Sequence, residues 1–403
     1  MKFNKWTVGL AAVGVVSLAS AARADERLSA VQTALSNTTI SGYVDTAATW
    51  RPGTDSGVVA GVPRANIPLY SFAKNDGFSL NAVNIALDKP EDESPWAAGY
   101  HAEFMLGLDA VGVGNGIRQA YVTLRMPIGN GLDWKVGVFD TIIGYESSSD
   151  PLNPNYTRSY GYSIEPTTHT GVLATYKIND IVTLQAGVAD SSNVGSGTVG
   201  VNPFAFESQK AVLGDVQFTA PDSAGWIKGA TMTAAIIEVP GSTLAPGSTS
   251  LYAGLTVPTP VTALKVGAAF DYLEFHNQHN AGGTVVKNAS DDSLWNVALY
   301  TTLQATDKLS FNLRAEYLDN TDASTLLNAA GNGSPGTLYA NSSAFECTGT
   351  IQYNLWANVI SRLEMRWDHA NTRHFGFSQN PGAIGSANRR NDLMMALNLI
   401  YQF

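Results

Sequence analysis

The chain has little cysteine, little charge and no long apolar run beyond its N-terminus. Its single cysteine, Cys347, excludes an intrachain disulfide framework. Charged residues make up 14% of the 403 residues, compared with about 25% in ordinary globular domains. After residue 24 there is no run of about 18 apolar residues, so the sequence predicts no membrane-spanning helix there. The chain therefore needs a source of stability other than disulfides and a surface that carries few charges.

The N-terminus has the features of a cleavable secretory signal. Lys2 and Lys5 supply positive charge, Trp6–Leu18 is apolar but too short to span a membrane, and Ala22–Ala24 fits the small-x-small cleavage rule. We expect a signal peptide over residues 1–24; the alternative is an N-terminal membrane anchor. Cleavage would remove three basic residues and change the net charge from −10 to −13 (−10 − 3). So acidic a chain argues against a nucleic-acid partner, which requires a basic face.

Most of the remaining sequence alternates between apolar and polar residues, which is the period of a β-strand. In GYHAEFMLGLD, for example, Tyr100, Ala102 and Phe104 alternate with His101 and Glu103. Such segments are about ten residues long, the length that a tilted strand needs to cross a bilayer. Sixteen of them centre near residues 45, 83, 104, 122, 136, 173, 186, 215, 233, 254, 268, 299, 313, 349, 364 and 397. The alternation slips in phase near residues 83 and 233, where a glycine or a β-bulge would account for it.

The connections between these segments alternate between short turns and long polar loops. Turns such as Pro127–Asn130 and Pro221–Gly225 are separated by Gly/Ser/Asn-rich loops such as Arg51–Gly77 and Asp140–Thr167. An outer-membrane barrel has this pattern, with turns at the periplasmic end and loops at the outer end. An extracellular β-sandwich also consists of strands and loops, but it has no reason to alternate their lengths.

These patterns predict an all-β fold, a transmembrane antiparallel up-and-down β-barrel of about sixteen strands over residues 39–403. Residues 25–38 are expected to form a short periplasmic leader or helix. The C-terminal stretch Asn391–Phe403 is expected to be the closing strand, paired with the strand around Tyr43. The predicted location is the bacterial outer membrane, with its lipid as the surrounding partner.

Several segments resemble one known family. They are ISGYVDT (Ile40–Thr46), FSLNAVNIALDKP (Phe78–Pro90), GLDA with RQAYV (Gly107–Ala110, Arg118–Val122), GNGLDWKVGVF (Gly129–Phe139) and the long stretch Gly144–Val172. Together they resemble the OmpL-like family of β-barrel porins, specifically over about residues 39–190. The resemblance implies an outer-membrane barrel that acts as a porin. It implies no particular solute and no catalytic residue.

The loop Asp140–Thr167 is the third long loop and the strongest candidate for a constriction. In sixteen-strand porins the third loop folds into the lumen and narrows it. We expect Glu146, Asp150, Arg158 and Glu165 of this loop to contribute acidic and basic groups to the constriction. The alternative is a loop that packs on the rim or against a neighbouring subunit.

Charged residues on the inward parity of the strands are the expected partners of this loop. The pore-lining candidates are Glu103, Arg125, Lys135, Lys265, Arg314, Glu316, Arg362, Glu364 and Arg366. Rings of charge set the ion preference of pores. The alternative interpretation is that these residues pair across neighbouring strands and fill the wall; both can hold.

Nothing in the sequence predicts catalysis, a cofactor or a metal. His276 and His279 have a metal-compatible spacing but no carboxylate or thiolate partners nearby. The segments around Asp291 and Asp319 lack the full spacing of a calcium loop. There is no G-x-S-x-G nucleophile elbow. We expect no enzyme, and we expect His169 to make a rim hydrogen bond.

The function predicted from the sequence is passive diffusion of small hydrophilic solutes or ions through a water-filled lumen, narrowed by the 140–167 loop. The acidic balance favours a weak preference for cations. A homotrimer is expected by analogy with other sixteen-strand porins. The alternatives are a non-conducting barrel that serves at the cell surface, a barrel enzyme and, last, a soluble extracellular sandwich.

Overall fold

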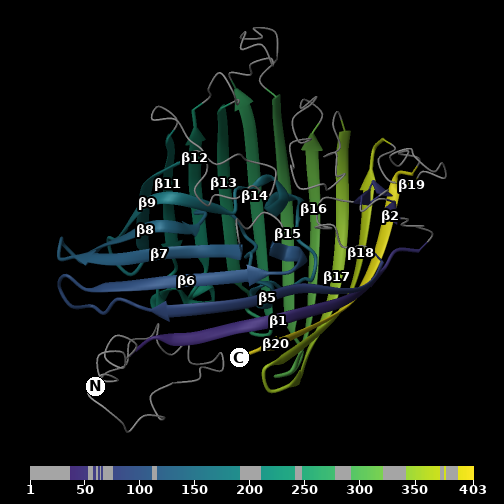
Figure 1. Ribbon diagram of the computed structural model, residues 1–403, viewed down its shortest axis with the longest axis horizontal. Helices are drawn as coiled ribbons and strands as arrows, with labels where there is room; N and C mark the ends of the chain where they lie inside the picture. The colour runs from purple at the N-terminus through teal and green to yellow at the C-terminus, as the bar shows by residue number, and fades with distance from the viewer. Residues whose placement is uncertain are drawn as a thin grey trace.

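Alternating segments of the chain form the strands of a closed barrel in the computed structural model (Figure 1). The structure describes residues 37–52, 58–59, 62–63, 65–66, 76–110, 116–190, 210–240, 247–276, 292–320, 342–372, 376–377 and 389–403. The expected signal peptide and nearly all of the 25–38 leader lie outside these residues. In the described part of the chain, no helix has the length and apolar character to cross a membrane.

Sixteen long strands make up the barrel wall. They are β1 (Thr39–Trp50), β5 (Gly77–Lys89), β6 (Ala98–Leu106), β7 (Ile117–Met126), β8 (Leu132–Asp140), β9 (Thr168–Lys177), β10 (Val182–Asp190), β11 (Lys210–Thr219), β12 (Thr231–Val239), β13 (Gly247–Pro258), β14 (Leu264–His276), β15 (Asp292–Gln304), β16 (Leu309–Asn320), β17 (Ser342–Trp356), β18 (Val359–Ala370) and β20 (Asn391–Gln402). Each pairs antiparallel with its neighbours in the ring. The predicted sixteen-strand antiparallel barrel is therefore confirmed, and each predicted centre falls within one of these strands.

The remaining elements are short and lie in the connections. The two-residue strands β2 (Val58–Val59) and β3 (Val62–Pro63) pair with each other, and β4 (Ala65–Asn66) pairs with β19 (Gly376–Phe377). The helices of the described residues are η3 (Leu108–Ala110), η5 (Asp150–Leu152), α3 (Tyr160–Ile164) and η6 (Asp222–Ile227). None of these elements was predicted, because segments this short leave no periodic signal in the sequence.

The barrel closes between the first and last strands. β1 pairs with β20 in a continuous register from Tyr43 with Gln402 to Trp50 with Met395. Beyond the last residue of β20, the backbone of Phe403 exchanges two hydrogen bonds of 3.0 Å with Gly42. The closing strand was thus correctly predicted. Closure leaves no unpaired edge, which is what a sheet surrounded by hydrocarbon requires.

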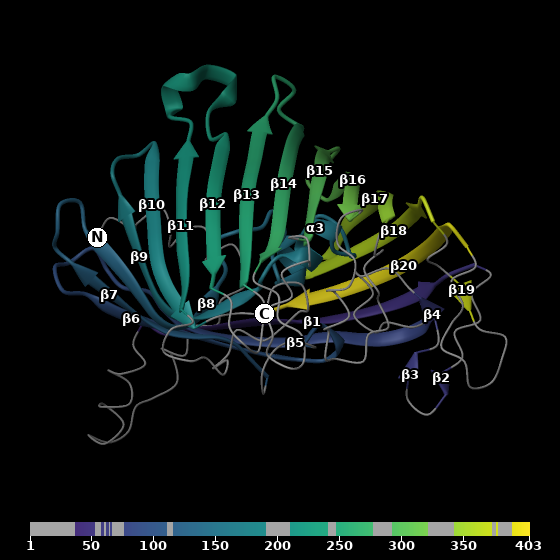
Figure 2. The ribbon, with the colours of Figure 1, turned by 90° about the horizontal axis from the view of Figure 1, so that it is seen from above.

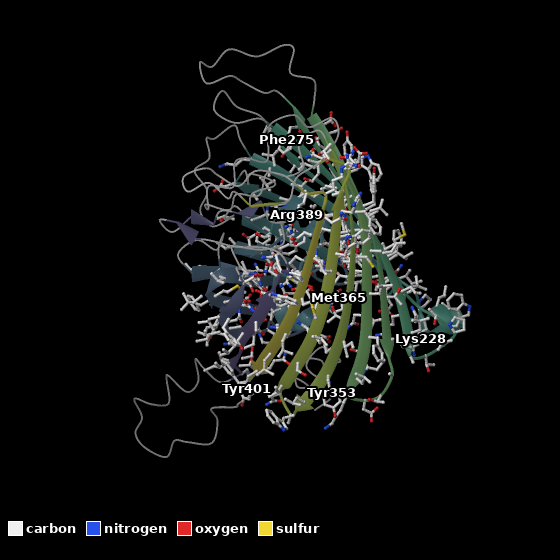
Figure 3. The ribbon with its side chains drawn as sticks, turned by 90° about the vertical axis from the view of Figure 1, so that its right-hand side faces the viewer. Lys228, Phe275, Tyr353, Met365, Arg389 and Tyr401 are labelled. Carbon is white, nitrogen blue, oxygen red and sulfur yellow. The ribbon has the colours of Figure 1, made fainter. Side chains whose placement is uncertain are left out.

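The two faces of the wall differ in chemistry, as β18 illustrates. Its outward residues Leu363, Met365 and Trp367 are 40–56% exposed, while its inward residues carry charge and are covered. Figure 3 shows Met365 on this outer surface, with Tyr353 and Tyr401 near the turn end of the barrel. An apolar outer face with aromatics near its border matches a barrel surrounded by lipid.

The predicted phase slip near residue 83 is a β-bulge. The register of β1 with β5 moves from Ala82 to Leu80 across from Asp45 and Thr46, so that Asn81 is inserted. Asn81 and Ala82 are both buried, although neighbours in a regular strand point to opposite faces.

The connections differ in length at the two ends of the barrel. β17 and β18 are joined by two residues only, whereas residues 141–167 separate β8 from β9. One predicted turn is wrong in length. Pro221–Gly225 is only part of an eleven-residue connection from Ala220 to Ala230, which contains η6 and two glycines with positive φ, Gly225 and Gly229.

Candidate functional site

The segment between β8 and β9, residues 141–167, is here called the inner loop. The structure describes it without a gap. It contains η5 and α3, and Figure 2 shows α3 within the ring of strands. Ser159 caps α3, because its side-chain oxygen accepts a hydrogen bond from the backbone N–H of Tyr162 at 3.0 Å. The loop thus has its own local structure before it meets the wall.

Inward side chains of β16, β17 and β18 hold the inner loop. These side chains, here called the anchor residues, are Arg314, Glu316, Glu346, Arg362, Glu364, Arg366 and Asp368. Their exposed fractions are 0–2%, because the inner loop covers them. Charges are so deeply buried only when they are paired or hydrogen-bonded.

Glu364 binds the middle of the loop. Its carboxylate accepts hydrogen bonds from the backbone N–H of Tyr156 at 2.5 Å and of Thr157 at 2.9 Å. It also accepts from the hydroxyls of Thr157 and Thr350, each at 2.7 Å. One carboxylate therefore satisfies two backbone donors of a segment that has no sheet partner of its own.

The three arginines of the anchor residues bind backbone carbonyls of the loop. Arg314 Nη1 donates to the carbonyl of Thr157 at 2.7 Å, and Arg366 Nη1 donates to that of Arg158 at 2.6 Å. Arg362 Nη2 donates to the carbonyl of Asn153 at 2.5 Å. The fixed fork of a guanidinium suits this task, because it offers five N–H donors in one plane.

Carboxylates on the wall and on the loop complete this network. Arg314 donates to Glu346 at 2.7 Å and to Glu146 of the inner loop at 2.7 Å. Glu146 also accepts the backbone N–H of Ser159 at 2.7 Å. Arg366 pairs with Asp368 at 2.8 Å. Each arginine charge thus has a carboxylate or several carbonyl oxygens as compensation, as a buried ion network requires.

The helix α3 packs against the wall through both polar and apolar contacts. The backbone N–H of Tyr160 donates to both oxygens of Glu316 at 2.8 Å, and its phenol donates to Asp368 at 2.5 Å. The guanidinium of Arg366 lies 5.1 Å from the centre of the Tyr160 ring. Tyr160 and Ile164 also join an apolar cluster with Leu273, Phe275, Leu294, Leu318, Ala344 and Ala370 of the wall. This apolar burial adds to the stability of the docked helix.

Within the inner loop, Arg158 and Asp150 form an ion pair at 2.6 Å. Glu165 lies beside Asp271 of β14, and the two buried carboxyl groups interact electrostatically. Burial raises the pKa of Glu165 well above its usual range, and the charge of Asp271 raises it further. Two buried carboxyl groups in contact share a proton, since both cannot ionise at low cost.

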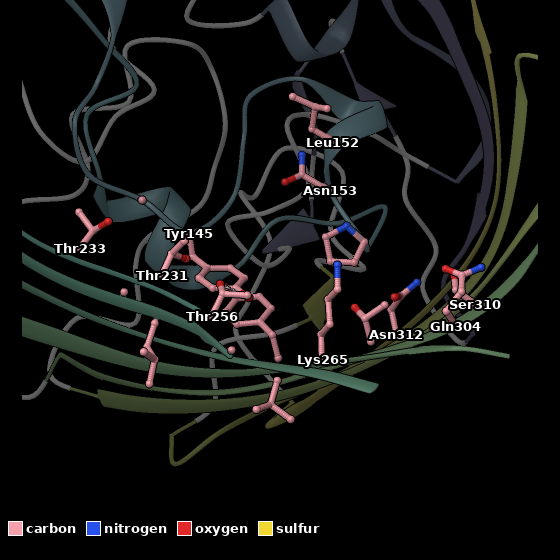
Figure 4. A pocket seen from close by; sticks show the side chains of 18 of the residues that line it. Tyr145, Leu152, Asn153, Thr231, Thr233, Thr256, Lys265, Gln304, Ser310 and Asn312 are labelled. Atoms are coloured by element: carbon pink, nitrogen blue, oxygen red, sulfur yellow. Dashed lines mark hydrogen bonds between the residues drawn. The ribbon is translucent and has the colours of Figure 1, made fainter. Parts of the chain in front are cut away.

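Below the inner loop, on the side of the turns, lies a cavity of about 530 Å³, here called the turn-side cavity. Its roof includes Tyr145 and Asn153 of the loop, and Lys265 rises from its wall (Figure 4). Tyr145 stacks on Tyr300 with ring centres 4.0 Å apart. The other side chains that line the turn-side cavity mostly carry hydroxyl or amide groups. They include Thr231, Thr233, Tyr252, Thr256, Thr302, Gln304, Ser310, Asn312 and Gln352.

The structure places the predicted residues in three groups. The first is the network just described, which joins Glu146, Asp150, Arg158, Arg314, Glu316, Arg362, Glu364 and Arg366. The wall residues of this group hold the loop and are covered by it, whereas Glu146 of the loop also lines a second cavity of about 220 Å³. Glu165 is also in the loop but faces Asp271 of the wall.

The second group lies on the wall of β6–β8. Glu103 accepts hydrogen bonds from Asn84 and Gln119 at 2.7 and 2.8 Å. Lys135 lies 5.0 Å from the ring centre of Tyr121. Arg125 pairs with Asp133 at 2.8 Å near the turn after β7. The third group is Lys265 alone, in the turn-side cavity.

Several residues of the site were not among those predicted from the sequence. Glu346 and Thr348 of β17 lie on the inward parity, opposite Cys347, so their period could have identified them. Arg118 and Asp140 form an ion pair on the wall. The docking of Tyr160 had no sequence signal, because it depends on how the loop folds back.

The histidines do not form a site in the described part of the chain. His169 is buried, and its Nε2 lies 3.0 Å from the hydroxyl of Thr141 at the base of the inner loop. The predicted hydrogen bond is therefore present. His279 lies outside the described residues, and among those described no group of three metal-ligating side chains occurs.

Solved structures with a similar fold are outer-membrane proteins. An anion-selective porin from Comamonas acidovorans is 13% identical, with 91% of this chain and 99% of that chain covered and a TM-score of 0.57. The trimer form of OmpT from Vibrio cholerae is 13% identical over 91% and 99% of the two chains, with a TM-score of 0.55. The outer-membrane channel DcaP of Acinetobacter baumannii is 12% identical over 91% and 97%, with a TM-score of 0.55. At such identities the likeness shows the fold alone.

A search of curated proteins finds no match. The family profile described as "Putative beta-barrel porin-2, OmpL-like" matches residues 37–403, which is the whole barrel. The resemblance seen in the N-terminal half of the barrel thus extends to its last strand, and the chain belongs to this family of outer-membrane β-barrel porins.

Proposed function

We propose that the protein is a passive diffusion porin for small hydrophilic solutes, and that the inner loop is its fixed constriction. The observation that carries this proposal is the anchoring of the loop. At least eleven hydrogen bonds join the inner loop to buried charged side chains of β16–β18. A loop that only covers the rim would not need so many contacts with the wall. A loop held so firmly sets one pore width instead of opening and closing.

The mechanism is size exclusion followed by polar contact, with no chemical step. A solute that passes the inner loop meets the hydroxyl and amide groups of the turn-side cavity. These groups replace part of its hydration shell without binding it through several charges at once. Weak, dispersed contacts of this kind allow a solute to enter and also to leave.

Liposome swelling tests the proposal directly. Liposomes that contain the purified barrel should swell in isotonic solutions of a small polyol such as glycerol, and more slowly as the sugar becomes larger. Barrel-free liposomes give the background rate. Swelling no faster than this background for the smallest solute would overturn the proposal.

A second candidate, a non-conducting barrel with a surface role, is favoured by one observation. Inside the wall, Phe139, Ile142, Ile143, Leu173, Leu213 and Ile237 form part of a large buried apolar cluster. Such a cluster fills space that water would occupy in a wide pore. The swelling experiment separates the two functions, because this barrel would admit no solute.

Export and assembly complete the proposal. We propose that residues 1–24 are removed on export to the outer membrane, that residues 25–38 remain on the periplasmic side, and that three copies assemble. The similar structure of OmpT from Vibrio cholerae is a trimer form, and this supports the assembly of three copies. Mass spectrometry of the outer-membrane protein in detergent measures both properties: a mature chain that begins at Asp25, and the mass of three chains.

A further inference from the structure

The carboxylates that face the barrel interior are already engaged. Glu346 and Asp368 pair with arginines, and Glu316 and Glu364 bind the backbone of the inner loop. The same holds elsewhere on the wall, for the pairs Asp88 with His101, Glu103 with Gln119, Asp133 with Arg125, Asp140 with Arg118, and Asp45 with Asn81 and Asn398. Each of these carboxylates therefore has a hydrogen-bond or ion-pair partner in the protein, and several pair with an arginine, so the net charge of the chain alone does not describe its lumen.

The turn-side cavity has the opposite balance. Among the described residues that line it, Lys265 is the one charged side chain, and no carboxylate is present. Lys265 lies on the inward parity of β14, together with Gly267, Ala269 and Asp271, and its side chain is exposed to the cavity. Figure 4 shows it pointing toward the part of the inner loop that carries Asn153.

Neighbouring groups add hydrogen-bond donors to this positive charge. Arg362 Nε donates to the side-chain oxygen of Gln352 at 2.9 Å, and this fixes the orientation of the amide. The NH₂ group of Gln352 is then the part of the amide that can donate hydrogen bonds in the cavity. The phenol oxygen of Tyr145 accepts a hydrogen bond from Thr256 at 3.2 Å, so its own proton can be donated elsewhere.

We infer that the turn-side cavity is a selectivity step for small anions, in which Lys265 supplies the attractive charge. This inference rests on the proposed diffusion function and reverses the weak cation preference expected from the acidic composition. Anions that pass the inner loop meet an ammonium group and N–H and O–H donors. Small cations meet the same ammonium group with no carboxylate beside it.

Reversal potentials in a potassium chloride gradient across a planar bilayer test the inference. The protein should pass chloride in preference to potassium. Lys265→Gln removes the charge and should lower the chloride-to-potassium permeability ratio about twofold near 1 M salt. One unit charge about 4 Å away attracts chloride and repels potassium, and salt at this concentration screens both effects. Lys265→Glu should reverse the preference.

Lys228→Gln is the matched control. Lys228 is on the connection between β11 and β12, does not line the cavity, and pairs with Asp222 at 3.1 Å. Its charge should have little effect near 1 M salt, where the Debye length is about 3 Å. Heat-dependent gel migration establishes that each variant is a folded barrel.

The possible outcomes separate the inference from the proposed function. A chloride preference that falls in Lys265→Gln and persists in Lys228→Gln supports the inference. A potassium preference in the unchanged protein, or a ratio unaltered in Lys265→Gln, overturns it while diffusion stands. A folded barrel that passes no current overturns the proposed function, and this inference with it.

Discussion

At the scale of single residues, the anchoring of the inner loop depends on a few atoms that serve several partners. The hydroxyl of Thr157 donates to Glu364 at 2.7 Å and accepts from Arg314 at 3.0 Å. Its backbone N–H and carbonyl bind the same two side chains. Thr157 therefore joins a buried acid to a buried base, and each loses a partner if the hydroxyl is removed.

We predict that Thr157→Val loosens the inner loop without unfolding the barrel. Valine keeps the shape of threonine but leaves buried polar partners unsatisfied, which costs about 1–3 kcal/mol. The backbone amides of residues 156–160 should then exchange with deuterium about five- to a hundredfold faster. Thr46→Val, on the exposed outer face of β1, is the isosteric control. Equal exchange in the two variants would show that the Thr157 hydroxyl does not hold the loop.

The face of the strand on which a residue lies could be predicted from the alternation, but the role of the residue could not. Alternation placed Arg362, Glu364 and Arg366 on one face of a strand, and they do lie on the inner face. Their partners are backbone groups of residues 153–158, some two hundred positions away in the chain. No local pattern encodes such a contact, so exposed pore charges and buried loop anchors have the same sequence signature.

At the scale of elements, the strands do not tolerate an added side chain at positions where two backbones approach closely. Gly137 in β8 has φ of 134°, and a Cβ there would lie 2.3 Å from the carbonyl oxygen of Ala120. Only glycine adopts this conformation without strain, and the obstructing atom belongs to the backbone of the paired strand.

Gly137→Ala should therefore destabilise the pairing of β7 with β8. The expected loss is about 1–3 kcal/mol, the cost of a strained backbone conformation. Thermal unfolding in detergent, followed by circular dichroism, measures it. Gly214→Ala in β11 is the matched control, since the nearest atom to its Cβ would be 3.9 Å away. If Gly214→Ala lowers the unfolding temperature as much as Gly137→Ala, the close approach is not the cause.

The inner loop as an element should be sensitive to pH through Glu165. Its pKa is raised by burial and by the facing charges of Asp271, Glu146 and Glu316. A raised carboxyl pKa in the docked loop means that docking is most favourable below the free value of about 4.3 and weakens as pH rises toward the docked value. Above the docked value, the full cost of burying the charge is present.

We expect hydrogen exchange of the inner loop, corrected for its intrinsic pH dependence, to accelerate as pH rises. Glu165→Gln removes the ionisable group but keeps a donor for Asp271, so its exchange should lose this dependence and be slower than that of the unchanged protein at high pH. Glu91→Gln is a control outside the loop, because burial also raises the pKa of Glu91, to about 7. A pH dependence that persists in Glu165→Gln but not in Glu91→Gln would assign the effect to Glu91.

At the scale of the whole molecule, the features of the barrel wall that a membrane requires could be predicted from the sequence. Low charge, strand length and alternating connections follow from a closed wall in lipid, and β1 to β20 match them. The interior has no such solvent rule, and its arrangement depends on how the inner loop folds back. For this reason the helix α3 and the coverage of the anchor residues could not be predicted, whereas the η6 connection was missed because so short a helix leaves no periodic signal.

The two ends of the described lumen also differ in a way that composition cannot show. Across the inner loop and the anchor residues, charge is dense and mutually compensated. Below it, in the turn-side cavity, Lys265 stands among neutral groups. A solute would therefore meet first a narrow passage and then a weakly positive one.

The most direct test of the constriction is single-channel conductance of the purified protein and of Glu364→Ala in a planar bilayer. The protein should show small, steady openings. In Glu364→Ala the loop loses the acceptor of two backbone N–H groups, so openings should become larger or fluctuate. Glu238→Ala, which removes an acid of β12 that accepts a hydrogen bond from the hydroxyl of Thr249, should leave them unchanged. Identical openings in the protein and in Glu364→Ala would contradict the role of the inner loop as the anchored constriction.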